Sequence, residues 1–299
     1  MTYHKPVLLN ESIEGLDIKP EGIYADLTFG GGGHSREILD RLGKKGKLLA
    51  FDQDRDAAEN MPNDKRITFI HANFRFLKNF LNYFEIKQLD GILADLGISS
   101  HQIDKISRGF TFRNKAALDM RMNKESGLTA EMILNEYPEN ELIRVFRDYG
   151  EIRGAHRFVK KIVQLRAKHK ISDTETLIGI VEDLIPGHQR NKTLARLFQA
   201  LRIEVNDEMG ALKDFLRISH EVLKKGGRLV VLSYHSVEDR MVKNLIKTGN
   251  IEGRLEKDFF GNPKQVFHAI NRNVIMPDED ELRHNPRSRS AKLRIAEKL

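Results

Sequence analysis

The stretch Asp26-Leu-Thr-Phe-Gly-Gly-Gly-Gly-His-Ser35 decides the fold of this chain, because it joins an apolar run to an amphipathic one. Ile23–Phe29 has the length and composition of a strand, and Ser35–Gly43 has the spacing of a helix. Glycines between a strand and a helix let the backbone approach a ligand closely. The stretch therefore predicts a strand, a ligand-binding turn and a helix, with a plain turn as the alternative.

The alternation of strand and helix continues on both sides of this stretch. Further apolar runs of strand length occur at 47–51, 67–70, 91–96 and 228–234, and the segments between them have helical spacing. Two late segments, 267–275 and 291–297, alternate apolar and polar residues. This order predicts an α/β fold built on a mostly parallel sheet that is covered on both faces.

The alternation stops in the middle of the chain. Residues 105–205 show helical patterns and no convincing strand, with helices expected at 139–149, 155–169, 174–184 and 193–205. We therefore expect a discontinuous domain made of 1–104 and 206–299, interrupted by a helical insertion. Basic residues gather in the insertion, where Arg153, Arg157 and Lys161 share one helical face. This pattern favours a role in recognising RNA, and a solvated face is the alternative for any single residue.

Two carboxylates indicate the cofactor. Asp26 lies four residues before Gly30, and Asp52 ends the next expected strand, where a carboxylate accepts hydrogen bonds from ribose hydroxyls. A carboxylate beside the loop suits a cofactor with a cationic amino-acid end, which favours S-adenosylmethionine over NAD. Asp54 is expected to be a solvated turn residue. Phe74 either lies against the adenine or belongs to the core.

Asp95 is the candidate for the reacting site, because ligands of parallel sheets bind beyond the carboxyl ends of strands. A carboxylate that accepts hydrogen bonds from an exocyclic amine favours a pyramidal nitrogen, whose lone pair then points at the methyl donor. The acidic/Asn-Pro-Pro-aromatic tetrapeptide typical of amine methyltransferases is absent, so the local sequence does not name the methylated atom. A second polar segment, 233–240, follows a later strand and suggests a helix capped by Ser236, or substrate contacts from His235 and Arg240.

Composition bounds the partners. The net charge is +7 and the isoelectric point is about 9.4, which suits a polyanionic partner without establishing one. The absence of cysteine excludes disulfides and thiolate metal sites, and we expect no metal. No apolar run is long enough to span a membrane, so a cytoplasmic protein is expected. Basic and aromatic residues alternate at Arg108, Phe110 and Arg113, a pattern suited to stacking an unpaired base.

Together these motifs resemble one family. The segments HKPVLLNE, DLTFGGGGHS, AFDQD, DLGISSHQID, RGFTF, LDMRM, YGE, FQALRIEVN, GGRLVVLSYHSVEDR and NPRSRSAKLR are similar, in this order, to those of the bacterial 16S ribosomal RNA cytosine-N(4) methyltransferases. The resemblance implies a class I, Rossmann-like S-adenosylmethionine methyltransferase fold with an antiparallel C-terminal strand and a helical insertion. One departure is Tyr234, which stands where phenylalanine is usual.

The resemblance also implies a function and a site. The substrate would be one cytosine amine in the decoding region of 16S ribosomal RNA, within the assembled small subunit. By motif position, the cofactor contacts fall on Gly32, Gly33, His34, Asp52, Phe74, Asp95 and Gln102. A small-molecule methyltransferase and a non-catalytic ribosome-assembly factor are the alternatives, and a homodimer is left open.

Overall fold

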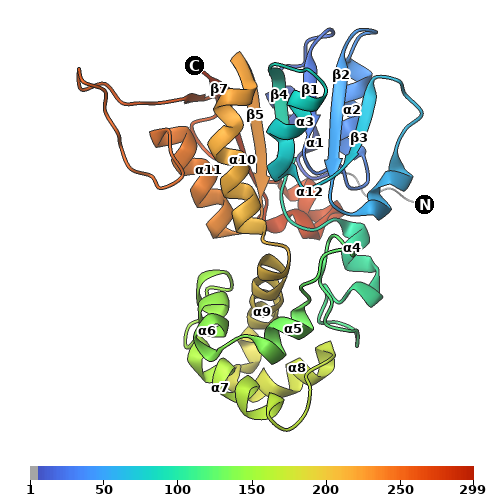
Figure 1. The fold of residues 1–299 in the computed structure, drawn as a ribbon, viewed down its shortest axis with the longest axis vertical. Coiled ribbons are helices and arrows are strands. Elements are labelled where there is room, and N and C mark those ends of the chain that lie inside the picture. The colour runs from blue at the N-terminus through green and yellow to red at the C-terminus, as the bar shows by residue number, and fades with distance from the viewer. Residues whose placement is uncertain (1–5) are drawn as a thin grey trace. The chain divides into compact units, whose positions relative to one another are not determined.

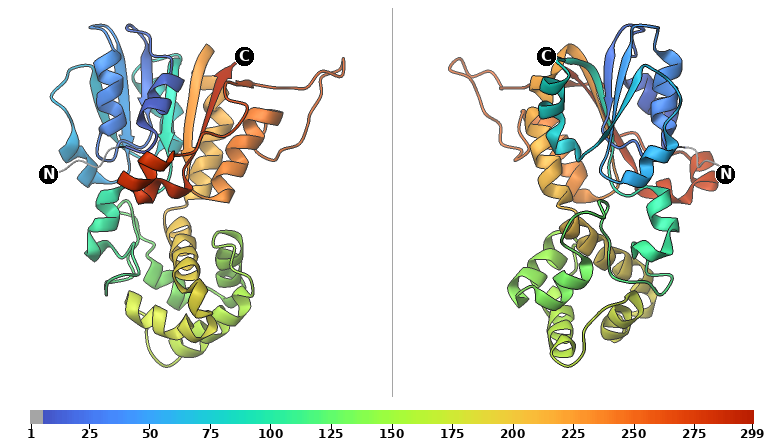
Figure 2. Two further views of the ribbon diagram at one scale, coloured as in Figure 1. Left: turned by 180° about the vertical axis from the view of Figure 1, so that it is seen from behind. Right: turned by 45° about the vertical axis from the view of Figure 1, so that its right-hand side comes forward.

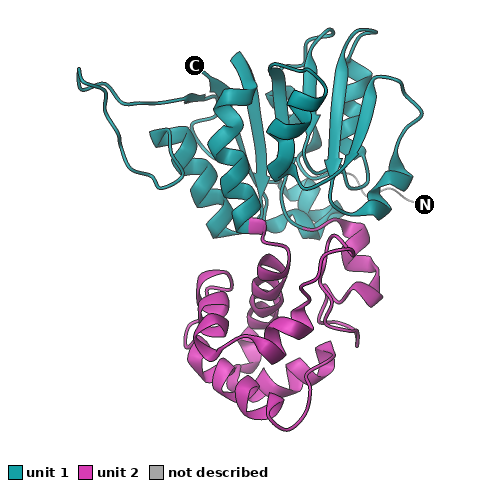
Figure 3. Cartoon of the chain, in the orientation of Figure 1, with its two compact units in different colours: residues 1–97, 209–299 teal, residues 98–208 magenta. Residues whose placement is uncertain are grey.

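The computed structural model describes residues 6–299, so His4 and Lys5 of the first motif lie outside the described residues. The chain forms two compact units (Figure 3), which we call the sheet unit, Met1–Gly97 with Met209–Leu299, and the helical unit, Ile98–Glu208. The helical unit is wider than the 105–205 expected from sequence. Ile98 packs against the helical core, and Arg202 Nε lies 2.7 Å from Glu208 Oε1, so both ends of the unit are held by its own contacts.

The sheet unit contains a sheet of seven strands in the order β3-β2-β1-β4-β5-β7-β6 (Figure 1). Strands β1 to β5 are mutually parallel, and β7 runs antiparallel to both β5 and β6. The predicted class I order, with an antiparallel strand near the C-terminus, is confirmed. The strands are β1 Ile23–Asp26, β2 Lys47–Asp52, β3 Ile67–His71, β4 Leu89–Asp95, β5 Leu223–Ser233, β6 Phe267–Ala269 and β7 Lys292–Lys298.

Helices cover both faces of the sheet (Figures 1 and 2). Alternate residues of β2, β5 and β7 join one core cluster with α1 (Leu9–Gly15) and α2 (Gly33–Arg41). The opposite face meets α3 (Leu77–Tyr83), whose Phe80 packs edge-on against Phe51, and also α10 (Glu208–Val222) and α11 (Ser236–Thr248). Burial on both faces explains why these strands read as continuous apolar runs. The remaining short helices of the unit are η1 Arg55–Asn60, η2 Phe74–Phe76, α12 Glu279–His284 and η6 Pro286–Ser290.

Two boundaries differ from the sequence prediction. The Lys-Lys-Gly-Gly segment 224–227 has the composition of a helix end, but α10 stops at Val222 and β5 already begins at Leu223. The pairing register between β4 and β5 shifts across this segment, where Gly226 has a φ of 75°. The residues that look like a helix end therefore lie in an irregularity of the β4–β5 pairing, within β5. The late strand expected over 267–275 is continuous only at Phe267–Ala269, and Ile275 adds a single antiparallel bridge to Leu293.

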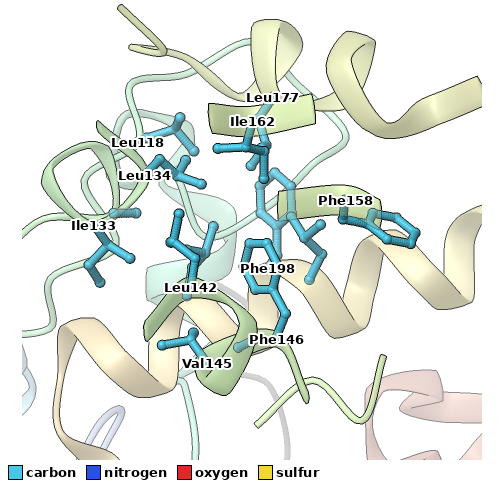
Figure 4. Close-up of a cluster of buried hydrophobic side chains, with 14 of the residues drawn as sticks. Leu118, Ile133, Leu134, Leu142, Val145, Phe146, Phe158, Ile162, Leu177 and Phe198 are labelled. Atoms are coloured by element: carbon cyan, nitrogen blue, oxygen red, sulfur yellow. The ribbon is translucent and has the colours of Figure 1, made fainter. Parts of the chain in front are cut away.

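The helical unit is built from helices around its own core, and its described residues include no strand. Figure 4 shows the cluster, to which Leu142, Phe146 and Phe198 contribute. The expected helices are present, and α5 was not predicted because it is only seven residues long. The helices are α4 Ser100–Asp104, η3 Ile106–Arg108, α5 Ala130–Glu136, α6 Glu139–Asp148, α7 Ala155–Arg166, α8 Thr174–Val181, η4 Glu182–Leu184, η5 Gly187–Gln189 and α9 Arg190–Val205.

Candidate functional site

The glycine loop is shaped by positions that a side chain would disturb. Gly30 and Gly32 have φ values of 50° and 74°, in the left-handed region that favours glycine. A Cβ at Gly32 would lie 2.8 Å from the Phe29 ring, and one at Gly33 would lie 2.2 Å from Pro6 Cγ. Gly32 is also the residue before α2 begins. The loop is therefore held tightly between β1 and α2, in a conformation that only glycine adopts without strain.

Two carboxylates, one buried and one partly buried, fix this loop. Asp26, at the end of β1, accepts hydrogen bonds from Ser35 Oγ at 2.6 Å and from the Thr28 amide at 3.1 Å. Asp52, at the end of β2, accepts from the Gly30 amide and the Asp54 amide, each at 2.8 Å. Burial raises the pKa of each carboxyl to about 6. Asp52 thus ties the glycine loop to β2 in addition to the ribose role expected of it.

Asp54 differs from its prediction as a solvated residue. It is only 4% exposed, and its side chain accepts a hydrogen bond from the Asp56 amide at the start of η1. The sequence shows an acidic residue after a strand, which is equally typical of a surface turn and of a helix cap. Asp54 is therefore a structural cap beside Asp52.

Asp95 lies at the end of β4 among polar side chains of the same unit. Its amide donates to Thr28 Oγ1 at 2.7 Å, and its Oδ1 accepts from the Tyr234 hydroxyl, also at 2.7 Å. His34 Nδ1 lies 3.9 Å from Asp95 Oδ2. Burial raises the pKa of Asp95 to about 7, against the hydrogen bond from Tyr234, which lowers it. Asp95 therefore ionises near neutral pH, as a group that exchanges protons at that pH must.

His34 does not supply a positive charge to this cluster. Burial lowers its pKa to about 4, so the ring is neutral at pH 7. Its Nε2 lies 3.3 Å from the Val7 carbonyl oxygen, an arrangement that places the proton on Nε2 and leaves the Nδ1 lone pair on the side of Asp95. His34 therefore shapes the site as a neutral group.

Sequence reasoning missed an outer layer of acidic groups. Glu238, 1% exposed, accepts from the Tyr234 amide at 2.9 Å, and Glu281 of α12 accepts from the Leu8 amide at 2.9 Å. Both raise the pKa of Asp95 through their charge, after the larger effect of burial. The substitution of tyrosine at 234 was visible in the sequence, but its contact with Asp95 depends on the pairing of β4 with β5.

Segment 233–240 forms the expected helix start with a different cap. His235, not Ser236, is the residue that caps α11, in a capping box with Glu238. His235 Nε2 also lies 2.9 Å from Glu238 Oε1, outside hydrogen-bond alignment. The histidine side chain is 7% exposed, so its observed role is to hold the helix start. Arg240 is exposed on α11.

The other expected contacts divide between the units. Phe74, in the sheet unit, is partly buried and packs edge-on against Phe215 with 5.9 Å between ring centroids. In the helical unit, Gln102 is 4% exposed and forms the capping box of α4 with Ser99. Because the units are described separately, Gln102 stays a predicted cofactor contact.

Two of the three residues predicted to stack a base, Arg108 and Phe110, are buried in the helical unit. The Arg108 guanidinium is buried and donates to the carbonyl oxygens of Arg121 and Met122 at 2.8 and 2.9 Å, and it lies 5.7 Å from the Phe110 ring centroid. Phe110 belongs to the helical core. Alternating basic and aromatic residues do not reveal burial, and here the arginine satisfies carbonyls inside the unit. Arg113 is exposed and stays a predicted substrate contact.

The sheet unit fits a cofactor that carries positive charge. Asp26, Asp52 and Asp95 all have a raised pKa, because burial disfavours the charged form of each carboxyl, and neighbouring acidic groups add a smaller effect for Asp52 and Asp95. A cation bound among them would lower the cost of ionising them. Gly97 adds room: its φ is 102°, and a Cβ there would meet only Tyr234 Cδ2, at 3.7 Å. A sulfonium and an ammonium group, as in S-adenosylmethionine, suit this donor set.

No helix in the described part of the chain has the length and apolar character to cross a membrane. Within the same residues, no three His, Asp or Glu side chains are grouped so as to hold a metal ion.

Comparison with known proteins places the chain in a family. The model of the MraW methylase family matches residues 1–299. A protein of Bacteroides thetaiotaomicron called ribosomal RNA small subunit methyltransferase H is 56% identical over 298 residues, covering 100% of this chain and 98% of the relative. Its namesake from Flavobacterium johnsoniae is 54% identical over 299 residues, covering 100% and 99%.

One solved structure illustrates the more distant similarity. It is an rRNA methylase from Streptococcus thermophilus, 13% identical, with a TM-score of 0.41 over 100% of this chain and 99% of that one, a similarity too weak to argue from. The full-length family match and the close relatives are decisive by themselves, and this chain belongs to the MraW methylase family.

Proposed function

We propose that this protein transfers a methyl group from S-adenosylmethionine to the exocyclic N(4) amine of one cytosine in the decoding region of 16S ribosomal RNA. The observation that carries the chemistry is Asp95, a carboxylate at a parallel strand end whose pKa is raised to about 7. The substrate class is supported by the relatives, which are named as small-subunit ribosomal RNA methyltransferases.

The cofactor is held by the ends of β1, β2 and β4 in this proposal. Asp52 accepts hydrogen bonds from the ribose, the backbone at Gly32 and Gly33 lies against the amino-acid part, and Phe74 lies against the adenine. Gln102 and His34 complete the contacts. S-adenosylmethionine supplies an electrophilic methyl group on a positively charged sulfur. The raised pKa values of Asp26 and Asp52 support a cationic ligand at this edge of the sheet.

Asp95 acts on the amine. Its carboxylate accepts a hydrogen bond from the N(4) amine, which turns the nitrogen lone pair out of conjugation with the base and orients it for in-line transfer. Methylation leaves the nitrogen with one proton too many, and a carboxylate with a pKa of about 7 is matched to accept it. Tyr234 positions Asp95 through the 2.7 Å hydrogen bond and is a positioning residue.

The helical unit recognises the RNA in this proposal, and the target base is splayed out, because a stacked amine is out of reach. The assembled small subunit is the substrate, which places the reaction in the cytoplasm. Basic side chains such as Arg113 and Arg240 are exposed and suited to contacting phosphates.

Deleting the gene and restoring it in variant forms tests this function. Small-subunit RNA is digested to nucleosides, and N(4)-methylated cytidine is measured by mass spectrometry. We expect the nucleoside to disappear in the deletion strain and return with the wild-type gene, but not with Asp95→Ala. Glu21→Gln is the matched control, since Glu21 is an exposed carboxylate whose side chain is 70% accessible. An unchanged amount of the nucleoside after deletion would contradict the proposal.

A further inference from the structure

The helical unit contains an open pocket of about 560 Å³ that the proposed chemistry does not use. It is lined mainly by the end of α6, the turn that follows, the start of α7 and one side chain of α9. The lining includes Arg147, Glu151, Arg153, Ala155, His156 and Arg196. The turn contains Tyr149-Gly-Glu151, one of the family-like motifs, to which no role has yet been assigned.

The turn is fixed by the core beneath it. A Cβ at Gly150 would lie 2.8 Å from the Phe146 carbonyl oxygen and 3.0 Å from that of Arg196, so only glycine allows this approach of α6 to α9. Gln199 donates to the Tyr149 carbonyl at 3.0 Å, and the Ile152 amide donates to that of Phe146 at 3.1 Å. The shape of the pocket is therefore preformed.

Positive charge converges on this pocket from three elements. Arg147 comes from α6, Arg153 from the turn and Arg196 from α9, against one acidic lining residue, Glu151. Glu151 lies 3.8 Å from Arg196, at the outer limit of an ion pair. Arg147 pairs with Asp148 at 2.7 Å, but its side chain is 64% exposed, so the pair is weakly held. The pocket thus carries an excess of guanidinium groups.

The start of α7 adds to this charge. Gly154 precedes the helix with a φ of 71°, no side chain caps it, and its first turn holds no acidic residue. A helix start carries partial positive charge that is normally offset by acidic side chains. Here arginines gather beside it instead. An arrangement that concentrates like charge is unfavourable by itself and becomes favourable once an anion binds.

We propose that this pocket binds the phosphate backbone of the RNA substrate. The inference rests on the proposed function for the identity of the anion, because guanidinium groups bind phosphate oxygens in a bidentate way whatever the base sequence. The volume accommodates more than one phosphate group, so a stretch of backbone fits. An acidic segment of a ribosomal protein is the competing occupant.

Binding of two probes to the full-length protein tests the pocket. The probes are a labelled RNA fragment of the decoding region, free of protein, and purified small subunits that lack the methyl group. We expect Arg153→Ala/Arg196→Ala to weaken RNA binding about tenfold or more. We also expect the slope of log affinity against log salt to become shallower by about 1.4, as for two lost single-strand phosphate contacts. The Arg153→Lys/Arg196→Lys variant should keep most of the salt slope and lose part of the affinity.

Arg190→Ala is the matched control, because Arg190 is partly exposed like Arg196, lies at the start of the same helix α9 and pairs with Glu182, away from the pocket lining. It should bind RNA as the wild type does. Calorimetry with S-adenosylmethionine and thermal melting establish that the variants are folded, since neither should change. Wild-type affinity and salt slope in the double alanine variant would overturn the proposal. Weakened binding to small subunits with unchanged binding to free RNA would assign the pocket to a protein partner instead.

The outcome is separable from that of the proposed function. RNA binding that depends on the two arginines, in a protein that methylates no cytosine, would leave the pocket standing and refute the methyl transfer. If both arginines can be replaced without changing cytosine methylation or RNA binding, the pocket proposal is refuted and the methyl-transfer proposal is supported.

Discussion

The two units gather opposite charges in the places where ligands are expected. The sheet unit places Asp26, Asp52 and Asp95 at strand ends, where Asp26 is buried and the other two are partly buried, each with a raised pKa. The helical unit lines an open pocket with arginines and leaves the start of α7 without an acidic cap. Each arrangement is costly in the free protein, and each becomes favourable with a ligand of the opposite sign. In both units, therefore, charged groups that are unfavourable in the free protein indicate a ligand-binding site.

Replacing Asp95 tests whether the acidic cluster of the sheet unit serves catalysis. We expect Asp95→Ala to lower the methylation rate about 10³-fold, the size typical of losing a group that handles a proton. S-adenosylmethionine binding, measured by calorimetry, should weaken far less. Asp95→Asn keeps the shape and removes the charge, so it should be almost as inactive. Equal losses of rate and cofactor affinity would mean that Asp95 only holds the cofactor.

The pH dependence of stability tests whether folding raises the pKa of these carboxyls. A carboxyl whose pKa is raised on folding stabilises the protein while protonated, and this stabilisation is lost as pH rises through the folded value. The free energy of unfolding without cofactor should therefore fall between about pH 4 and pH 7. Asp26, raised from 3.8 to about 6, corresponds to about 3 kcal/mol. Asp26→Asn should flatten the profile, and saturating cofactor should offset the fall. A profile that rises over this range would contradict the burial argument.

Replacing Arg108 tests whether this residue stabilises the helical unit or binds RNA. Arg108→Ala leaves two buried carbonyl oxygens without their donor, so we expect a loss of about 2 kcal/mol in unfolding free energy, seen in denaturant unfolding. RNA affinity measured below the transition should change little. Arg113→Ala, an exposed neighbour, should leave stability unchanged. A stable Arg108 variant with weak RNA binding would restore the base-stacking role.

Tyr234→Phe sharpens the account of Asp95 with the smallest effect. The hydrogen bond from Tyr234 lowers the pKa of Asp95, so its removal should raise that pKa. The acidic limb of the rate profile should shift to higher pH, with a loss of about fivefold in rate at pH 7, or about 1 kcal/mol, and partial recovery at pH 8. If the acidic limb of the rate profile does not shift, the Tyr234 hydroxyl does not affect the pKa of Asp95.

The sequence predicted the features that depend on local pattern and failed where contacts join distant segments. The strand ends that carry Asp26, Asp52 and Asp95 were predictable, because parallel strands bring their carboxyl ends to one edge. The hydrogen bond from Tyr234 to Asp95 required the β4–β5 pairing, and Glu281 entered through a contact with Leu8 far away in the chain.

In the helical unit, the helices were predictable from their spacing, but burial was not. Arg108 and Phe110 have the composition of an RNA surface and belong to the interior. The arginine pocket was hidden because its three guanidinium groups come from positions 147, 153 and 196, which only packing brings together.

Methyl transfer with purified components tests the central claim most directly. The protein is incubated with small subunits that lack the modification and with S-adenosylmethionine labelled in its methyl group, and the RNA is then digested to nucleosides. The account predicts label in N(4)-methylcytidine from one cytosine of the decoding region, and none with Asp95→Ala. Label in any other nucleoside, or transfer that needs no RNA, would contradict it.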